Sequence, residues 1–116
     1  MIYLASPYSH DDPKVREERF LAVCRYVANM TRAGHRVFSP IAHTHCVAVH
    51  GGLGLGWEYW DEWDKEMIRL CDGFGVLCLE GWDRSKGVKA EREYALSLNR
   101  EIGYLLPTQV FSAGVI

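Results

Sequence analysis

The apolar residues of the chain fall into short continuous runs separated by longer amphipathic stretches. Four short runs are typical of buried strands, and three stretches have the 3.6-residue spacing of helices. The expected strands are residues 2–5, 36–39, 73–79 and 102–106, and the expected helices are residues 13–33, 58–70 and 86–98. Strands that alternate with helices predict an α/β fold with a mostly parallel sheet and helices on both of its faces.

The ends of the first helix are marked by particular residues. Asp12 precedes Pro13, which is the order of an N-cap and a first helical position, and Gly34 is suited to end the helix. The following stretch is less regular: residues 41–49 fit one short helix. The four glycines within residues 51–56 predict a mobile loop that is suited to act as a lid.

Two carboxylates occupy positions where a helix should be apolar. At 100° per residue Glu91 lies on the inward stripe of its helix, whereas Glu93 points the opposite way. Asp64 lies at the centre of the inward arc of the preceding helix, and Asp61 lies at its edge. The other expected members of the two inward faces are Val88, Ala95 and Leu98, and Trp60, Met67, Ile68, Leu70 and Cys71.

An unpaired buried carboxylate costs several kcal/mol, so Glu91 and Asp64 each need a fixed partner or an opening into a pocket. In parallel α/β sheets ligands bind where the strands end at their carboxyl side. The loops at that edge are residues 6–12, 39–45 and 80–87. The sequence therefore predicts that these loops and the two carboxylates converge on one cleft.

A carboxylate pair suits glycosidic-bond chemistry, with one group as the nucleophile and the other as the proton donor and acceptor. Partial burial and a nearby like charge would raise the pKa of one group. The structural alternative is that each carboxylate forms an ion pair with Arg84, Arg92 or Arg16. Two inward carboxylates on helices that flank one strand favour a site.

Other residues offer binding chemistry beside a structural explanation. Ser6 and the Ser85-x-Gly87 turn could hold a phosphate, although Ser85 also suits a plain N-cap. Tyr8, in a polar loop, is a better candidate for stacking on a ligand than the core or interface aromatics. Those other aromatics are Tyr3, Trp57, Trp60 and Trp63. The His43-x-His45 pair does not favour zinc, because its members point to different faces of a helix.

Composition narrows the function classes. The chain has 116 residues, which suits a single domain over residues 1–116, and a formal net charge of −2. Near-neutral charge argues against binding a nucleic acid polymer or an anionic membrane surface. No apolar run could span a bilayer, and the first strand leaves no room for a targeting segment. The four widely spaced cysteines fit buried free thiols, so we expect a cytoplasmic protein.

The residues resemble the nucleoside 2-deoxyribosyltransferase family, which includes the 2′-deoxynucleoside 5′-phosphate N-hydrolases. The resemblance covers the whole chain in order and spacing, and is closest to a small branch of the family. It is carried by the run Tyr3-Leu4-Ala5-Ser6-Pro7-Tyr8, by Asp64 with Asp72 before an apolar strand, and by Ser85-x-Gly87-x-x-x-Glu91-x-x-x-Ala95. The last of these is the most specific.

By position, the resemblance implies that Glu91 is the nucleophile that attacks C1′ of the sugar. Asp64 matches the carboxylate that assists departure or entry of the base. Ser85 and Gly87 match the sugar or 5′-phosphate loop, and Tyr3 and Ser6 match the contacts of the first strand. The resemblance also implies a flavodoxin-like or Rossmann-like three-layer sandwich of four to five strands, a homodimer or homotetramer, and no metal or organic cofactor.

The chain departs from the family after the glutamate, where an apolar residue and a glycine usually follow, whereas Arg92 and Glu93 stand here. The sequence predicts cleavage or transfer of an N-glycosidic bond in a nucleoside or nucleoside 5′-monophosphate. One alternative is a nucleotide-binding module without turnover, with its carboxylates held in ion pairs. Another is a hydrolase of a different ribosylated ligand that uses the same two carboxylates.

Overall fold

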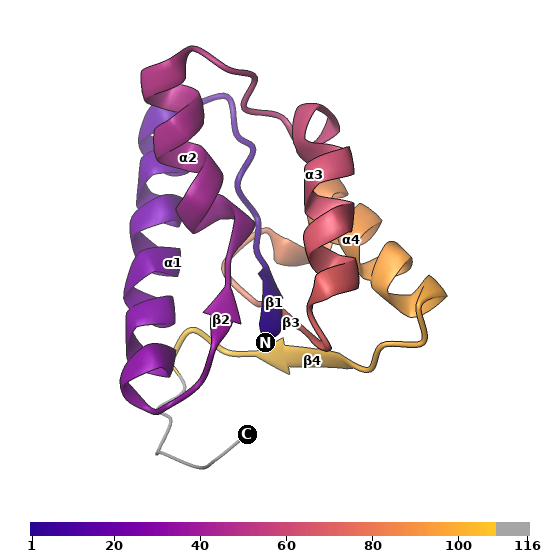
Figure 1. Ribbon diagram of the computed structural model, residues 1–116. Helices are drawn as coiled ribbons and strands as arrows, with labels where there is room; N and C mark the ends of the chain where they lie inside the picture. The colour runs from indigo at the N-terminus through magenta and orange to yellow at the C-terminus, as the bar shows by residue number, and fades with distance from the viewer. Residues whose placement is uncertain (109–116) are drawn as a thin grey trace.

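The computed structural model describes residues 1–108, and over this range it has the predicted α/β class (Figure 1). Four strands form one parallel sheet in the order β2-β1-β3-β4. The elements in chain order are β1 (Ile2–Ala5), α1 (Pro13–Arg32), β2 (Val37–Phe38), α2 (Pro40–Gly51), α3 (Trp57–Leu70), β3 (Gly73–Leu77), the 3₁₀ turn η1 (Trp82–Arg84), α4 (Lys86–Ser97) and β4 (Ile102–Leu105). The architecture is a three-layer flavodoxin-like sandwich.

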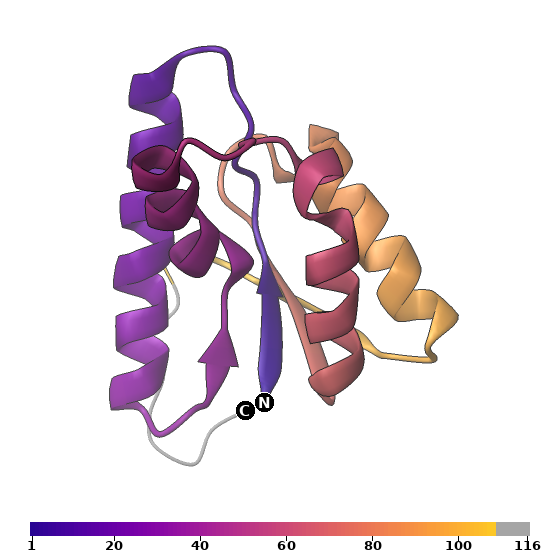
Figure 2. The same ribbon diagram turned by 45° about the horizontal axis from the view of Figure 1, so that its top comes forward.

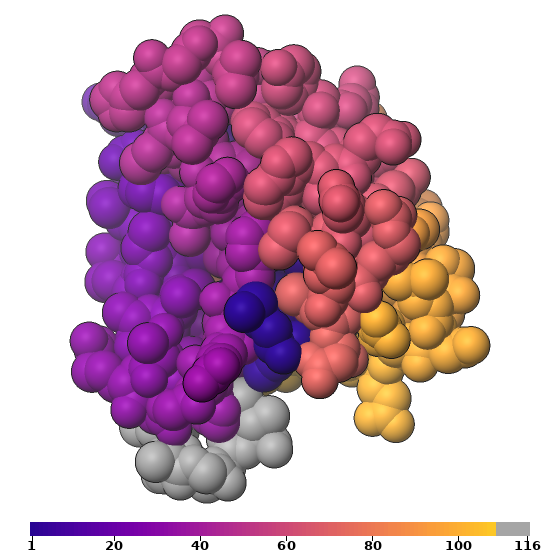
Figure 3. All heavy atoms as spheres, in the orientation of Figure 1, coloured from indigo at the N-terminus to yellow at the C-terminus, as the bar shows by residue number. Residues whose placement is uncertain are grey.

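Helices cover both faces of the sheet. Figure 2 shows α1 and α2 on one side of β1, and α3 and α4 on the other side. The two layers have separate buried clusters, one of which joins α1 to the sheet while the other joins α3 and α4 to it. In Figure 3 the first residues of the chain (indigo) reach the surface between the parts of the molecule coloured purple and salmon.

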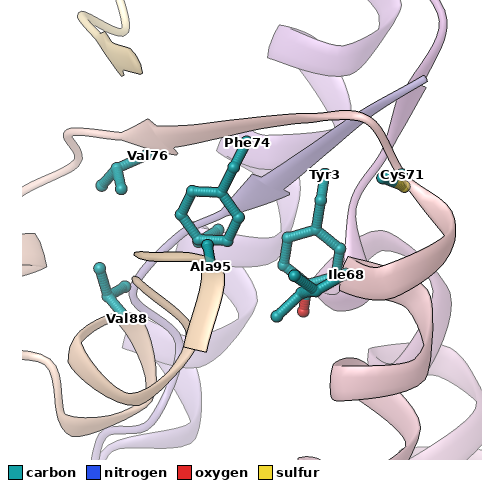
Figure 4. Packing of buried hydrophobic residues seen from close by; sticks show 8 residues of the cluster. Tyr3, Ile68, Cys71, Phe74, Val76, Val88 and Ala95 are labelled. Atoms are coloured by element: carbon teal, nitrogen blue, oxygen red, sulfur yellow. The ribbon is translucent and has the colours of Figure 1, made fainter. Parts of the chain in front are cut away.

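The alternation of side chains along β1 sends neighbouring residues into different clusters. Tyr3 and Ala5 face α3 and α4, whereas Leu4 faces α1. Because Tyr3 is paired with Phe74 in the parallel register of β1 and β3, their rings stack with centroids 5.6 Å apart. Figure 4 shows these two rings side by side, with Ile68 next to Tyr3. Tyr3 therefore carries its hydroxyl towards the α3–α4 layer.

The ends of α1 and α4 follow the expected capping chemistry. The side chain of Asp12 accepts a hydrogen bond from the Lys14 amide at 2.9 Å, and Ser85 accepts one from the Val88 amide at 3.2 Å. Gly34, after α1, has a φ of 94°, which is the left-handed region that favours glycine. These local signals position the amino ends of both helices at the carboxyl edge of the sheet.

Several expected boundaries are wrong. The second strand has only two residues, and α2 extends to Gly51, so the glycine-rich connection is shorter than expected. Leu70, expected to point inward, is 72% exposed. It lies about 120° around α3 from Asp64 at 100° per residue, which places it outside the buried arc. All four cysteines are free, but Cys46 is exposed rather than buried.

The strand order creates a crevice at one end of the sheet. The chain leaves β1 towards α1 on one face and leaves β3 towards α4 on the other, and β1 and β3 are neighbours. Such a reversal opens the sheet at its carboxyl edge.

Over residues 1–108, no helix has the length and apolarity needed to cross a membrane. The sequence also predicts that the short apolar tail, residues 107–116, packs on a neighbouring chain, and its residues 109–116 lie outside the described range.

The packing of α3 gives a matched test of the core. Ile68 is 1% exposed, whereas Leu70 on the same helix is largely in solvent. Ile68→Ala should lower the free energy of unfolding by about 2–5 kcal/mol, because it leaves a cavity in the core. Leu70→Ala should change it by less than about 0.5 kcal/mol. Urea denaturation measures both variants, and equal losses would contradict the assigned orientation of α3.

Candidate functional site

A cavity of about 410 Å³ opens at the carboxyl edge of the sheet, at the crevice between β1 and β3. Its wall is built by the loop that follows β1, the first turns of α2, the connection between α2 and α3, the inner side of α3, and the segment from η1 into α4. The residues that line it are Ser6, Tyr8, Ser9, Ile41, Thr44, Leu55, Gly56, Trp57, Glu58, Trp60, Asp64, Arg84, Ser85, Lys86, Gly87 and Glu91. The structure thus brings both candidate carboxylates into one cavity.

Glu91 is held from behind by Tyr3. The Tyr3 hydroxyl, which is fully buried, donates a hydrogen bond of 2.5 Å to Oε2 of Glu91. Burial and the charges of Glu91 and Asp64 raise the pKa of Tyr3 well above its ordinary value. Tyr3 therefore keeps its proton and remains a donor to Glu91. It is not part of the cavity wall, so its direct contact with a substrate stays a prediction.

Asp64 and Glu91 lie close enough to share a hydrogen bond between their carboxyl groups. Burial raises the pKa of Asp64 to about 6, although the bond with Glu91 acts in the opposite direction. Burial and the charge of Asp64 raise the pKa of Glu91 well above its ordinary value. Two buried carboxyl groups in contact cannot easily both ionise, so the pair retains one proton near neutral pH.

No arginine neutralises the charge of the carboxyl pair within residues 1–108. Among residues 1–108, neither Asp64 nor Glu91 forms an ion pair with an arginine. Arg92 instead donates to the Tyr104 hydroxyl at 3.5 Å, and Arg16 binds the backbone oxygen of His10. The structural alternative of arginine ion pairs is therefore wrong for the described residues. The open side of the carboxyl pair is the cavity.

Two buried polar atoms at the cavity wall have no hydrogen-bond partner within residues 1–108. They are Oγ of Ser6 and Oδ1 of Asp64, and their side chains are only 6% and 7% exposed. Leaving such a group unsatisfied costs about 1–3 kcal/mol. A polar ligand in the cavity would supply the missing partners, and Ser6 and Asp64 lie where a bound molecule would meet them.

The first turn of α4 forms one side of the cavity. Ser85 caps the helix, and Gly87 allows this turn to lie against Trp57 of α3, because a Cβ atom at Gly87 would stand 3.1 Å from Cβ of Trp57. Arg84 and Lys86 are exposed on either side of Ser85 and also line the cavity. A helix amino terminus with two cations is suited to bind an anion.

Aromatic rings form another part of the wall. Trp57 and Trp60, one turn apart on α3, both line the cavity, and the indole Nε1 of Trp60 donates to the Gly54 carbonyl at 2.7 Å. This bond fixes the short glycine-rich connection against α3. Trp63 does not line the cavity and stacks instead on His43, with centroids 4.9 Å apart.

Tyr8 lines the cavity on the side of α2. It is 7% exposed, and its hydroxyl is 2.5 Å from Nδ1 of His45. His45 in turn contacts Oε2 of Glu17 through Nε2 at 2.8 Å. The two histidines of the His43-x-His45 pair thus have separate partners. No group of three or more potential metal ligands occurs in the described range.

Six of the seven predicted site residues line the cavity, and Tyr3 lies behind Glu91. Arg92 and Glu93, which depart from the resembled family, are not part of its wall. Sequence reasoning missed Thr44 and Lys86, and it assigned Trp57 and Trp60 to a core or an interface. The helical spacing of the two tryptophans could not show which residues would meet the end of the sheet.

Comparison with known families adds a classification. Residues 1–105 match the family described as Domain of unknown function (DUF1937). The chain belongs to this family. No curated protein matches it. The description of DUF1937 assigns no activity.

The carboxyl pair gives a pH dependence of stability with a definite sign. The pKa of Asp64 is about 6 in the folded protein and about 4 in an unfolded chain. Between these values the folded state binds more protons, so the free energy of unfolding should fall as pH rises from 4 to 7. The shift of Asp64 alone should give a loss on the order of 2 kcal/mol, and the raised pKa of Glu91 should add to it, as measured by urea denaturation at each pH.

Asp64→Asn should flatten this dependence, because it removes one of the two coupled groups. Glu93→Gln, on the exposed side of α4, is the matched control and should retain the slope of the wild-type protein. A wild-type protein that gains stability over the same pH interval would contradict the assigned state of the pair.

Proposed function

We propose that the protein cleaves or transfers the N-glycosidic bond of a nucleoside or nucleoside 5′-monophosphate. The observation that carries this proposal is the Asp64–Glu91 carboxyl pair, which opens into a cavity and has no arginine partner within residues 1–108. The reaction needs a nucleophile that attacks C1′ of the sugar and an acid that protonates the leaving base. A carboxyl pair with a single proton provides both.

The first step would use the two members differently. Asp64 gives the shared proton to the leaving base as the bond from C1′ to nitrogen breaks, and the bonding electrons leave with the base. An oxygen of Glu91 forms a bond to C1′, which gives a covalent glycosyl ester. The hydrogen bond from Tyr3 stabilises the anionic form of Glu91 and partly offsets the burial that raises its pKa, and the reacting state is the one in which the proton has moved to Asp64.

The second step returns the enzyme to its starting state. Water attacks C1′, the bond to Glu91 breaks, and Glu91 leaves as a carboxylate. The proton released by the water returns to Asp64, so no proton is gained or lost over the cycle. A second base in place of water would give transfer instead of hydrolysis, with the same residues in the same roles.

The dimensions and lining of the cavity support this class of substrate. A volume of about 410 Å³ lies within the range of small-molecule sites, about 300–1,000 Å³. Trp57 and Trp60 offer flat surfaces for a base, and Ser6 offers a free hydroxyl for a sugar. In this arrangement a 5′-phosphate would lie at the amino end of α4, beside Arg84 and Lys86.

The proposal includes an assembly and a compartment. Six large apolar side chains within residues 1–108 are exposed on α2, α3 and their connection, and a second copy of the chain could cover them in a homodimer or homotetramer. They are Val47, Val49, Leu53, Tyr59, Trp63 and Leu70. The four free cysteines suit a reducing compartment such as the cytoplasm.

Release of free base from a panel of nucleosides and nucleoside 5′-monophosphates, followed by chromatography, tests the proposed chemistry. Glu91→Ala should abolish base release, because the covalent intermediate cannot form. Glu93→Ala, two residues away on the exposed side of α4, should retain activity within about threefold. Equal activity of the two variants would refute the assignment of Glu91.

Binding of the same nucleotides without any base release by the wild-type protein would favour the alternative of a binding module. In that case the carboxyl pair would serve recognition rather than catalysis. Release of a group other than a base from a ribosylated ligand would favour the third possibility, a different hydrolase with the same two carboxylates.

The phosphate position gives a separate prediction. Lys86→Met should raise the KM for nucleoside 5′-monophosphates about tenfold and leave the KM for unphosphorylated nucleosides nearly unchanged, because a charge-assisted bond is lost. Lys89→Met, on the same helix but not on the cavity wall, is the control and should change neither. Equal effects on both substrate classes would place the phosphate elsewhere.

A further inference from the structure

A chain of hydrogen bonds leads from solvent to the cavity wall through three separate elements. Glu17 on α1 is half-exposed, His45 on α2 is buried, and Tyr8 lies in the loop after β1. The contacts are 2.8 Å from Oε2 of Glu17 to Nε2 of His45, and 2.5 Å from Nδ1 of His45 to the Tyr8 hydroxyl. The carboxyl chemistry proposed above uses none of these three side chains.

The direction of these hydrogen bonds follows from the chemistry of the groups. An ionised carboxylate only accepts, so Nε2 of His45 carries the hydrogen that Glu17 receives. In the neutral imidazole, Nδ1 then holds a lone pair and accepts the proton of the Tyr8 hydroxyl. Phe20 stacks on the His45 ring with centroids 4.2 Å apart, which helps to hold the ring in this orientation.

Tyr8 keeps its proton in this environment. Burial raises the pKa of Tyr8, and Arg16 lowers it to a smaller extent through its charge and a hydrogen bond to the Tyr8 oxygen, which occupies one of the two acceptor positions of that oxygen. The hydroxyl proton is therefore present and committed to His45. The Tyr8 oxygen, beside the cavity, can accept a hydrogen bond from a ligand but has no proton to donate.

We infer that the Tyr8 oxygen accepts a hydrogen bond from a donor group of the substrate. His45 and Glu17 are positioning residues, because they direct the Tyr8 proton away from the cavity. The inference rests on the nucleotide class proposed above, and the donor would be a sugar hydroxyl or a base amino group. An analogue with an acceptor at the same place would set two lone pairs against each other. The site would thus discriminate by polarity as well as by shape.

Binding to the wild-type protein can be followed through the fluorescence of Trp57 and Trp60, which needs no turnover. The first probe is adenosine 5′-monophosphate. Three further probes each lack one donor, namely the 2′-hydroxyl, the 3′-hydroxyl or the 6-amino group. One deletion should weaken binding to the wild-type protein about tenfold and have little effect on binding to Tyr8→Phe. That deletion identifies the group that Tyr8 recognises.

The positioning role is tested with an analogue that carries an acceptor in place of the identified donor, such as fluorine for a hydroxyl or a keto oxygen for the amino group. His45→Leu frees the Tyr8 proton, so this analogue should bind at least fivefold more tightly than it binds to the wild-type protein. His45→Asn supplies an acceptor oxygen near the position of Nδ1 and should retain the wild-type preference. His43→Leu, whose side chain stacks on Trp63, is the control and should also retain it.

The outcomes separate this inference from the proposed function. Equal losses in wild-type protein and Tyr8→Phe for every deletion would overturn the role of Tyr8. An unchanged preference in His45→Leu, or a wild-type preference for the acceptor analogue, would overturn the assigned polarity. If no probe binds, both the inference and the nucleotide proposal fail. Base release without a Tyr8-dependent difference would leave the proposed function standing alone.

Discussion

The structure of the site depends on one contact between buried acids. Asp64 and Glu91 come from different helices, lie against each other beside a cavity, and have no cationic partner within residues 1–108. Retaining one proton removes most of the electrostatic cost of this contact. The hydrogen bond from Tyr3 lowers the pKa of Glu91 and so partly offsets the burial and the charge of Asp64, which raise it. The same geometry leaves the pair with one protonated and one ionised group, which are the two states that the proposed chemistry requires.

The fold brings these groups together through the order of its strands. Tyr3 lies on β1, next to the point where the strand order of the parallel sheet reverses, and its side chain faces the α3–α4 layer. The helices before and after β3 supply Asp64 and Glu91, so one central strand pair supports all three groups. The same edge receives the capped start of α4, which brings backbone amides and Lys86 next to the cavity. The strand order thus brings a carboxyl pair and a capped helix start to one cavity within a chain of 116 residues.

Much of this arrangement could be predicted from residue spacing. The inward positions of Asp64 and Glu91 follow from the 3.6-residue period, since each stands where its helix should be apolar. The cap at Ser85 and the convergence of three loops follow from local chemistry and from the parallel sheet. The outward position of Glu93 follows from the same period. In each case the position of the residue follows from its close neighbours in the sequence.

Other features depend on contacts between distant residues, which spacing does not encode. Glu17 and His45 are 28 residues apart, and nothing in the sequence indicates that α1 and α2 lie side by side so that the two bond. Trp57 and Trp60 line a cavity because α3 begins at the edge of the sheet, whereas their composition alone suits a core. Leu70 was misplaced because residues at the margin of an apolar arc can lie on either side of it.

The most direct test of the shared proton is a titration of the side-chain carboxyl carbons by ¹³C nuclear magnetic resonance. The account predicts that the resonances assigned to Asp64 and Glu91 titrate together, with one transition near pH 6 and the other well above the ordinary range of a glutamate. In Tyr3→Phe the upper transition should move to still higher pH, because the anion of Glu91 loses its donor. Independent titration of both groups near pH 4 would contradict the account.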